Sequence, residues 1–227
     1  PPINAAHQFE VYYTGKEVHA SSYPERGVNA ADALTVAQVA IGLLRQHIRP
    51  TDRIHGIITK GGDAPNVVPA HTSATYMVRA KSLQELDEIK GRVYRCFEAG
   101  ALATGATLEF VERERAYSEL RSDPDLARLY KANAEALGRV FPDLGPGLER
   151  FAGSTDMGNV SLALPAIHPM IGIYSLPAVN HQPEFAAHCV TEVADRAVLD
   201  GALAMAWTII DAATDEGVRK RLLRRSR

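Results

Sequence analysis

The stretch VPAHTSATYMVRAKSLQELDEI, residues 68–89, joins a strand pattern directly to a helix start. Apolar side chains alternate with polar ones between Val68 and Val78, as a half-buried strand requires. Val68, Ala70, Ala74, Tyr76 and Val78 share one face, and His71, Ser73, Thr75 and Arg79 share the other. Ser82 with Glu85 three residues later forms a capping box, which predicts a helix immediately after the strand.

Further strands and one further helix are predicted before and after this strand and helix. Residues 7–14 (HQFEVYYT) and 54–59 are predicted strands, and residues 107–111 form the last strand. Between the first two strands, apolar residues recur at helical spacing from Asn29, the expected N-cap, to Ile48. The order strand, helix, strand, strand, helix, strand predicts a ferredoxin-like α+β domain over residues 1–117, with an antiparallel sheet and both helices on one face.

Residues 118–227 have a different character. Asp123-Pro124 is an N-cap followed by proline, and it predicts a helix to about Val140. A buried strand is expected within residues 166–174, and a long apolar helix from Thr191 to Ala213. One or two strands cannot close a sheet, so this half is predicted to be part of a larger α/β domain. The basic tail, residues 219–227, is interpreted as a solvated helix end or as a contact for an acidic partner.

Composition narrows the class of protein. A chain of 227 residues with 46% hydrophobic and 23% charged residues can bury a core, and a net charge of −2 favours neither nucleic acid nor a membrane surface as partner. No signal-peptide pattern is present. Cys96 and Cys189 are far apart, which indicates a reducing cytoplasm rather than a disulfide framework. The start at Pro1 indicates a processed or truncated product, or a recombinant piece without its flanking residues.

Two histidines lie in polar loops where a side chain can reach a ligand. These are His19 in GKEVHASSYP and His181 in VNHQPEF, although a surface or capping role is the plainer interpretation of each. His181 has Glu184 and His188 nearby, but Pro183 interrupts the helical register between them. The segment GSTD, residues 153–156, suits an anion such as a carboxylate, and it equally suits a simple turn.

Four motifs together resemble the M20 family of metallopeptidases and amidohydrolases. They are GKEVHASSYPERGVNAADAL (15–34), GGDAPNVVPA (61–70) with Arg79 following, GSTDMGNVS (153–161) and NHQPEF (180–185). They occur in the family's order and cover nearly the whole chain. The last two most resemble the branch that contains peptidase M20 domain-containing protein 2 and the aminobenzoyl-glutamate hydrolases.

The resemblance implies an activity and a partner. Members of the family hydrolyse an amide bond, here expected in small N-acyl amino acids or dipeptides, with one or two divalent ions. The metal is usually zinc, and sometimes manganese or cobalt. The resemblance also implies a homodimer through the edge strand and helix of the ferredoxin-like domain, which serves as the lid.

The resemblance assigns roles to residues as well. His181 would be a metal ligand, and His19 would reach the partner's active site to stabilise the oxyanion. Asn66 and Arg79 would bind the substrate's carboxylate or the transition state. The segment Gly153, Ser154 and Thr155 would hold the substrate's carboxylate end. Arg115 lies near a further arginine position of some relatives, with a poor local match.

The chain departs from the family pattern in one respect. The family's other metal ligands and its general-base glutamate precede the lid, and this sequence has no such segment. One histidine cannot hold a catalytic zinc, which takes about three protein ligands. The complete protein is therefore predicted to be a hydrolase, and this chain alone to be inactive. Two alternatives are a non-catalytic dimerisation or small-ligand-binding module, such as a regulatory amino-acid-binding domain, and a truncated product that only dimerises.

Overall fold

The computed structural model describes residues 3–142, 145 and 153–224. These residues form two compact units. We call residues 3–120 together with 153–159 the sheet unit, and the remaining described residues the helical unit. Each unit is described by itself.

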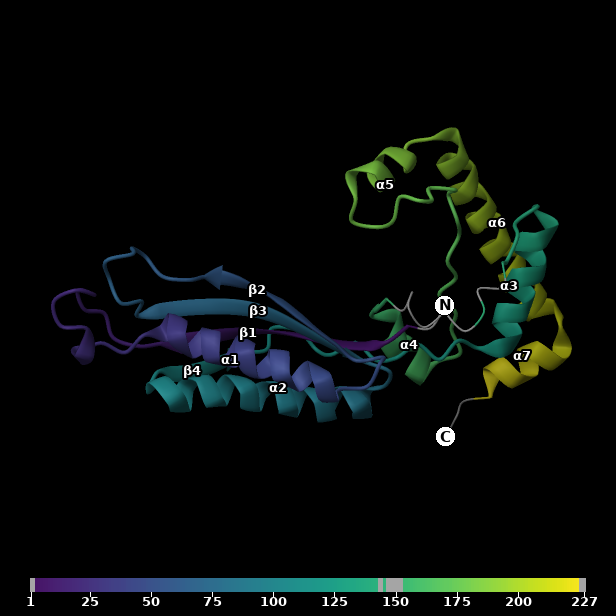
Figure 1. Cartoon of the computed structure of the whole chain (residues 1–227). Helices are drawn as coiled ribbons and strands as arrows, with labels where there is room; N and C mark the ends of the chain where they lie inside the picture. Colours follow the sequence, from purple (N-terminus) through teal and green to yellow (C-terminus); the bar gives the residue numbers. More distant parts are fainter. Residues whose placement is uncertain (1–2, 143–144, 146–152, 225–227) are drawn as a thin grey trace. The chain divides into compact units, whose positions relative to one another are not determined.

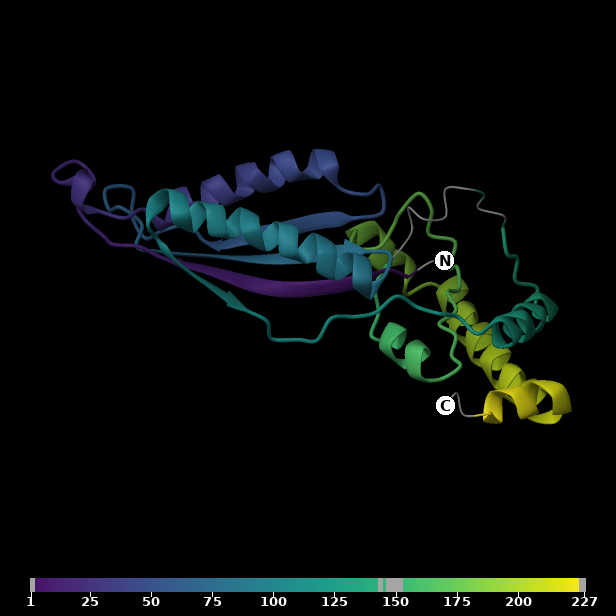
Figure 2. The same ribbon diagram turned by 90° about the horizontal axis from the view of Figure 1, so that it is seen from below.

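The sheet unit contains four antiparallel strands in the order β2-β3-β1-β4. The strands are β1 (Ala5–Thr14), β2 (Arg53–Lys60), β3 (His71–Ala80) and β4 (Thr107–Val111). Helices α1 (Ala30–Leu44) and α2 (Leu83–Thr104) cover the same face of the sheet (Figures 1 and 2). The predicted ferredoxin-like order and the antiparallel sheet are confirmed.

An aromatic cluster fills the space between this sheet and its helices. Phe9 from β1 contacts Tyr76 from β3 and Phe97 from α2, with ring centroids 6.4 and 6.0 Å apart. The Tyr13 hydroxyl donates to the Phe97 carbonyl at 2.6 Å, so its polar end is satisfied inside the core. Gly56 in β2 lies beside the Tyr76 ring, and a Cβ there would come within 2.6 Å of it.

The helix starts follow the sequence closely, but several predicted ends were wrong. Asn29 and Ser82 accept backbone hydrogen bonds as N-caps of α1 and α2. The predicted strand at Val68 begins only at His71, because residues 66–70 bond to the loop after β1 instead. The first helix ends at Leu44 and continues as a 3₁₀ turn (Arg45–His47) rather than reaching Ile48. A second 3₁₀ turn, Pro24–Arg26, lies in the loop after β1.

Outside the sheet unit's strands and first two helices, the regular elements of the described residues are helices. The helices are α3 (Pro124–Ala136), α4 (Met157–Ala163), α5 (Pro183–His188), α6 (Glu192–Thr214) and α7 (Glu216–Leu223). Asp123 caps α3 as predicted, and Thr191, where a long helix was expected to begin, caps α6. α3 stops before Val140, and Gly138 follows in the left-handed region (φ 83°). Arg221 of α7 pairs with Asp123 and Asp125, so part of the basic tail binds acidic groups of this chain.

The strand expected within residues 166–174 does not form. The structure has only a single parallel bridge there, between Ser122 and Ala166. Pro169 and Gly172 interrupt the apolar run, and neither residue supports a continuous ladder. A strand also needs a neighbour with which to exchange hydrogen bonds, and none pairs with this run in the described part of the chain.

Helix α6 exposes much apolar surface. Its buried face consists mainly of small residues such as Ala197, Gly201 and Ala204. Val198 and Ile209 are 70% exposed, and Leu203 and Ile210 are also open to solvent. By length and composition alone this helix qualifies as a membrane span, a test that core helices of water-soluble proteins also pass. The exposed face is consistent with the prediction that this half is part of a larger domain.

Candidate functional site

His19 and Asn66 are brought together at one end of the sheet. The loop after β1 and the loop before β3 lie side by side there (Figure 1), joined by a bridge between His19 and Val67. The Ala20 N–H donates to the Asn66 carbonyl at 2.9 Å. Both side chains are exposed. The two loops therefore form one tip that carries both predicted residues.

The hydrogen bonds of His19 fix which ring nitrogen faces outward. The backbone N–H of Ser21 donates to Nδ1 at 3.3 Å, and the Ser21 hydroxyl lies 3.0 Å from the same atom. A backbone N–H can only donate, so Nδ1 must carry a lone pair. The proton of the neutral ring is then on Nε2, which makes no hydrogen bond within the described part of the chain. The tip thus presents an N–H donor to solvent.

Arg79 and Ser154 form a second group at the other end of β3. The Arg79 guanidinium donates from Nη1 to the Ser154 hydroxyl at 2.7 Å and from Nε to Nε2 of His55 at 3.3 Å. Burial lowers the pKa of Arg79 but leaves it charged at neutral pH. Among the described residues no carboxylate pairs with it. His55 was missed from the sequence, because it belongs to no motif and its contact with Arg79 depends on strand register.

The neighbours of Ser154 have mainly structural contacts. Thr155 accepts the Met157 N–H at 3.3 Å, which is the turn expected as the simpler interpretation of this segment. The Gly153 carbonyl accepts the Asn4 N–H at 2.9 Å. Gly158, which the sequence did not single out, is needed sterically, since a Cβ there would lie 2.1 Å from the Ser118 carbonyl oxygen. Of this segment, Ser154 alone contacts another predicted site residue.

The two groups are far apart within one chain. His71 begins β3 at the tip, and Arg79 lies eight residues further along the same strand. At roughly 3.4 Å per residue this separates the ends by about 27 Å. A small substrate therefore cannot contact the His19 tip and the Arg79 group of the same sheet unit.

His181 lies in the helical unit, in the loop before α5. It is exposed and has φ 70°, a left-handed conformation that is uncommon outside glycine, asparagine, aspartate and histidine. Pro183 is the first residue of α5, so it starts this helix rather than breaking one. In residues 3–142, 145 and 153–224, no three His, Cys, Asp or Glu side chains gather as a metal site. The described residues therefore do not fit a catalytic metal by themselves.

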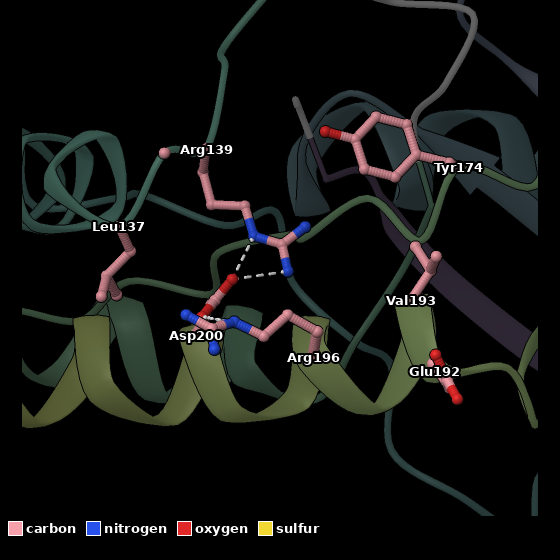
Figure 3. Close-up of a pocket in the computed structure, with 8 residues that line it drawn as sticks. Leu137, Arg139, Tyr174, Glu192, Val193, Arg196 and Asp200 are labelled. Atoms are coloured by element: carbon pink, nitrogen blue, oxygen red, sulfur yellow. Dashed lines mark hydrogen bonds and ion pairs between the residues drawn. The ribbon is translucent and has the colours of Figure 1, made fainter.

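An open pocket of about 440 Å³ lies between α6 and the residues after α3. Figure 3 shows Arg139 and Arg196 pointing toward Asp200, which is 4% exposed. Arg139 reaches Asp200 at 2.9 Å, and Arg196 lies at the same distance from its other oxygen. Three of the pocket's charged groups thus pair with one another, and this ion triad fastens the segment after α3 to α6.

Replacing Asp200 by alanine is expected to destabilise the helical unit by about 2–3 kcal/mol, since it leaves the mostly buried Arg139 unpaired. Arg196→Ala is the control, because this side chain is 66% exposed and its pair contributes about 0–1 kcal/mol. Urea denaturation followed by circular dichroism measures both. Equal effects of the two substitutions would show that Asp200 does not hold the triad together.

The sequence of the sheet unit matches a known class of domain. Residues 5–104 match the M20 model described as a peptidase dimerisation domain. Residues 5–104 of the sheet unit are thus an M20 peptidase dimerisation domain, and the resemblance of the chain to the M20 family is confirmed. Its α+β fold agrees with this assignment. The further assignment of the second half to an α/β zinc-peptidase domain stays a prediction.

Individual relatives cover nearly the whole chain. The Xaa-Arg dipeptidase of Mus musculus is 38% identical over 223 residues, which are 96% of this chain and 52% of that protein. One of the p-aminobenzoyl-glutamate hydrolase polypeptides of Escherichia coli (strain K12) is 25% identical over 258 residues, covering 91% of this chain and 54% of that protein. The chain thus spans about half the length of these relatives.

A solved structure shares the fold. The aminobenzoyl-glutamate utilization protein from Klebsiella pneumoniae aligns with a TM-score of 0.57 at 19% identity. The alignment covers 93% of this chain and 48% of that one.

Proposed function

We propose that the complete protein hydrolyses an amide bond in small N-acyl amino acids or dipeptides, and that it does so as a homodimer with a shared active site. The carrying observation is the separation of the His19–Asn66 tip from the Arg79–Ser154 group along β3. The names of the relatives, a dipeptidase and an aminobenzoyl-glutamate hydrolase, support this substrate class. Such substrates carry a free carboxylate, which an unpaired arginine suits.

The free edge of the sheet supports the dimer. β2 is an edge strand of eight residues, and only Ile54 in it is buried. Ile57 and Ile58 are 67% and 48% exposed. An edge with unpaired backbone groups and exposed apolar side chains pairs readily with another strand. We therefore propose that the partner is a second copy of this chain, paired through β2.

Two-fold symmetry makes the two β2 strands antiparallel. The Lys60 end of one strand, which leads into the tip, then lies beside the Arg53 end of the other. Arg53 is opposite Arg79 in the register of β2 and β3. The tip of one protomer is then two or three strand spacings, about 10–15 Å, from the partner's Arg79. A small substrate can span this distance of about 10–15 Å, whereas it cannot span the separation of about 27 Å within one chain.

Each group then has a chemical task. The Nε2–H of His19 would donate to the oxyanion that develops on the scissile carbonyl. Asn66, on the same tip, would bind the transition state. Arg79, held by Ser154, would bind the substrate's carboxylate from the other protomer, with Gly153 and Thr155 shaping that segment. No residue of this chain is assigned to the activation of water.

The metal belongs to the proposal as well. The complete protein would hold a divalent metal with His181 as one ligand. The metal proposed is zinc, and manganese or cobalt are the alternatives. A metal there would polarise the scissile carbonyl and supply hydroxide. Because the described residues do not form such a centre, we propose that the 227-residue chain alone is inactive. Hydrolysis of a dipeptide by the isolated chain that a chelator abolishes would contradict this.

A complementation experiment tests the shared site. It uses a longer polypeptide, in which this chain is joined to the part of a relative that this chain does not cover. His19→Ala and Arg79→Ala are each expected to lower dipeptide hydrolysis by about 10²–10³-fold, as the loss of a transition-state donor does. Mixing the two variants should restore up to about 25% of the activity, since half of the dimers are then mixed and each has one intact site.

The controls distinguish the alternatives. Each variant mixed with itself should stay inactive. If mixing restores nothing although both variants dimerise, the two groups do not act across the dimer. If neither substitution changes hydrolysis, the assigned site is wrong. Carboxylate binding without any hydrolysis would favour the alternative of a non-catalytic ligand-binding module.

A further inference from the structure

Arg79 is a partly buried cation whose neighbours are neutral or positive. Among the described residues, its side-chain hydrogen bonds go to the His55 imidazole and the Ser154 hydroxyl. Directly across the strand pair lies Arg53, and like charges at opposed positions destabilise a sheet. A charge of this kind without a carboxylate costs free energy unless an anion binds. The group is thus arranged for a ligand rather than for the stability of the sheet.

The chemistry of the His55–Arg79 contact fixes the state of the imidazole. The Nε of arginine can only donate, so Nε2 of His55 must accept and must be unprotonated. Partial burial lowers the pKa of His55, and Arg79, Arg45 and Arg53 lower it further. No carboxylate in the described part of the chain pairs with His55 to oppose this. Near neutral pH the imidazole is therefore an acceptor, as the contact requires.

Fixing Arg79 at two points directs its remaining donors. Nε donates to His55 on β2, and Nη1 donates to Ser154, which lies just before α4. A guanidinium has five N–H donors, so three have no partner among the described residues and remain for an incoming group. Without His55 the side chain would be held by Ser154 alone and would lose rotamer order, which weakens any bond that depends on its orientation.

We propose that His55 is a positioning residue, which orients the Arg79 guanidinium for the carboxylate of the substrate. This rests on the proposed function, in which Arg79 binds that carboxylate. His55 itself touches Arg79 and not the reacting atoms. A substrate with a free α-carboxylate, as in a dipeptide or an N-acyl amino acid, is the class that this arrangement selects.

The test is acetate binding to the full chain, followed by the ¹⁵N NMR signal of the Arg79 Nε–H. Acetate is expected to shift this signal in the wild-type chain. His55→Leu, which removes the acceptor, should weaken acetate binding about fivefold, the equivalent of one hydrogen bond. His55→Gln, which offers an amide oxygen as acceptor, should bind acetate as the wild type does. His55 is on the exposed side of an edge strand, so both variants keep the core intact.

A pH titration gives a second readout that a merely structural role would not produce. As pH falls, His55 gains a proton at Nε2 and stops accepting. The Arg79 Nε–H signal should therefore move together with the ring signals of His55 in the wild type. In His55→Gln it should not move over that range. An Arg79 signal that ignores the titration of His55 would overturn the proposal.

Arg79→Gln separates this inference from the proposed function. If Arg79→Gln abolishes acetate binding and His55→Leu leaves it unchanged, the anion site stands and the role of His55 is wrong. If Arg79→Gln binds acetate like the wild type, Arg79 is not the carboxylate site, and both proposals about this group are wrong. Should His55→Leu fail to fold, the wild-type titration and His55→Gln still decide the matter.

Discussion

Gly100→Ala is expected to destabilise the sheet unit by about 3 kcal/mol, the upper range for forcing extra volume into a packed core. Gly100 lies in α2 where it crosses α1 closely. A Cβ at this position would be 2.2 Å from the Ala33 carbonyl oxygen and 2.9 Å from the Tyr13 hydroxyl. The first contact is with backbone, so it cannot be relieved by a side-chain rotation. The helices would have to separate, and the aromatic core beneath them would loosen.

The same helix offers a matched control. Gly91 also lies within α2, but a Cβ there would meet only the end of the Arg95 side chain, at 3.9 Å. Gly91→Ala should therefore stabilise the chain by about 0.5–1 kcal/mol through helix propensity. Urea denaturation followed by circular dichroism measures both changes. Two substitutions with the same sign would show that the close approach of α1 and α2 is not what constrains Gly100.

Ile57→Lys is expected to weaken the proposed homodimer by about 100-fold or more, since a lysine on an edge strand is a common device against edge-to-edge pairing. Two-fold symmetry brings two copies of the new charge into one interface, which adds repulsion. The side chain is 67% exposed in the single chain, so the fold of the sheet unit should not change. Sedimentation over a range of chain concentrations measures the dissociation constant.

Leu102→Lys is the control for this experiment. Leu102 is 88% exposed on α2, away from β2, and the substitution introduces the same charge. It should leave dimerisation unchanged. In the polypeptide extended to the length of the relatives, Ile57→Lys should also abolish hydrolysis, because a shared site needs both protomers. A variant that is monomeric and fully active would contradict the shared site, and equal weakening by both lysines would contradict pairing through β2.

Part of the fold could be predicted because local rules produce it. The Ser82–Glu85 capping box places its hydrogen bond three residues apart, and the structure contains that bond at 3.3 Å. The alternation from Thr72 to Val78 likewise appears as alternating burial along β3. Predictions failed where an element depends on pairing with another segment of the chain. The apolar residues 166–174 form no strand, since in the described part of the chain no strand lies beside them.

The candidate site divides in the same way. The resemblance to the M20 family identifies the motif around His19 and the position of Arg79. It does not show which other residues each of them lies beside. Ser154 is 75 residues from Arg79 in sequence, and His55 is 24 residues away. Such contacts depend on how β2 and β3 are registered and on where the returning segment passes. No short-range pattern encodes either of these, which is why His55 was missed.

The sequence by itself determined the order of strands and helices in the sheet unit, most of the helix caps and the resemblance to the M20 family. Periodicity and capping act within a few residues, and the resemblance rests on short motifs. Only the tertiary structure decided that His19 and Asn66 share one tip, and that Arg79, Ser154 and His55 lie at the far end of the same strand. The physical reason is the length of β3, which holds the two groups apart within a single sheet.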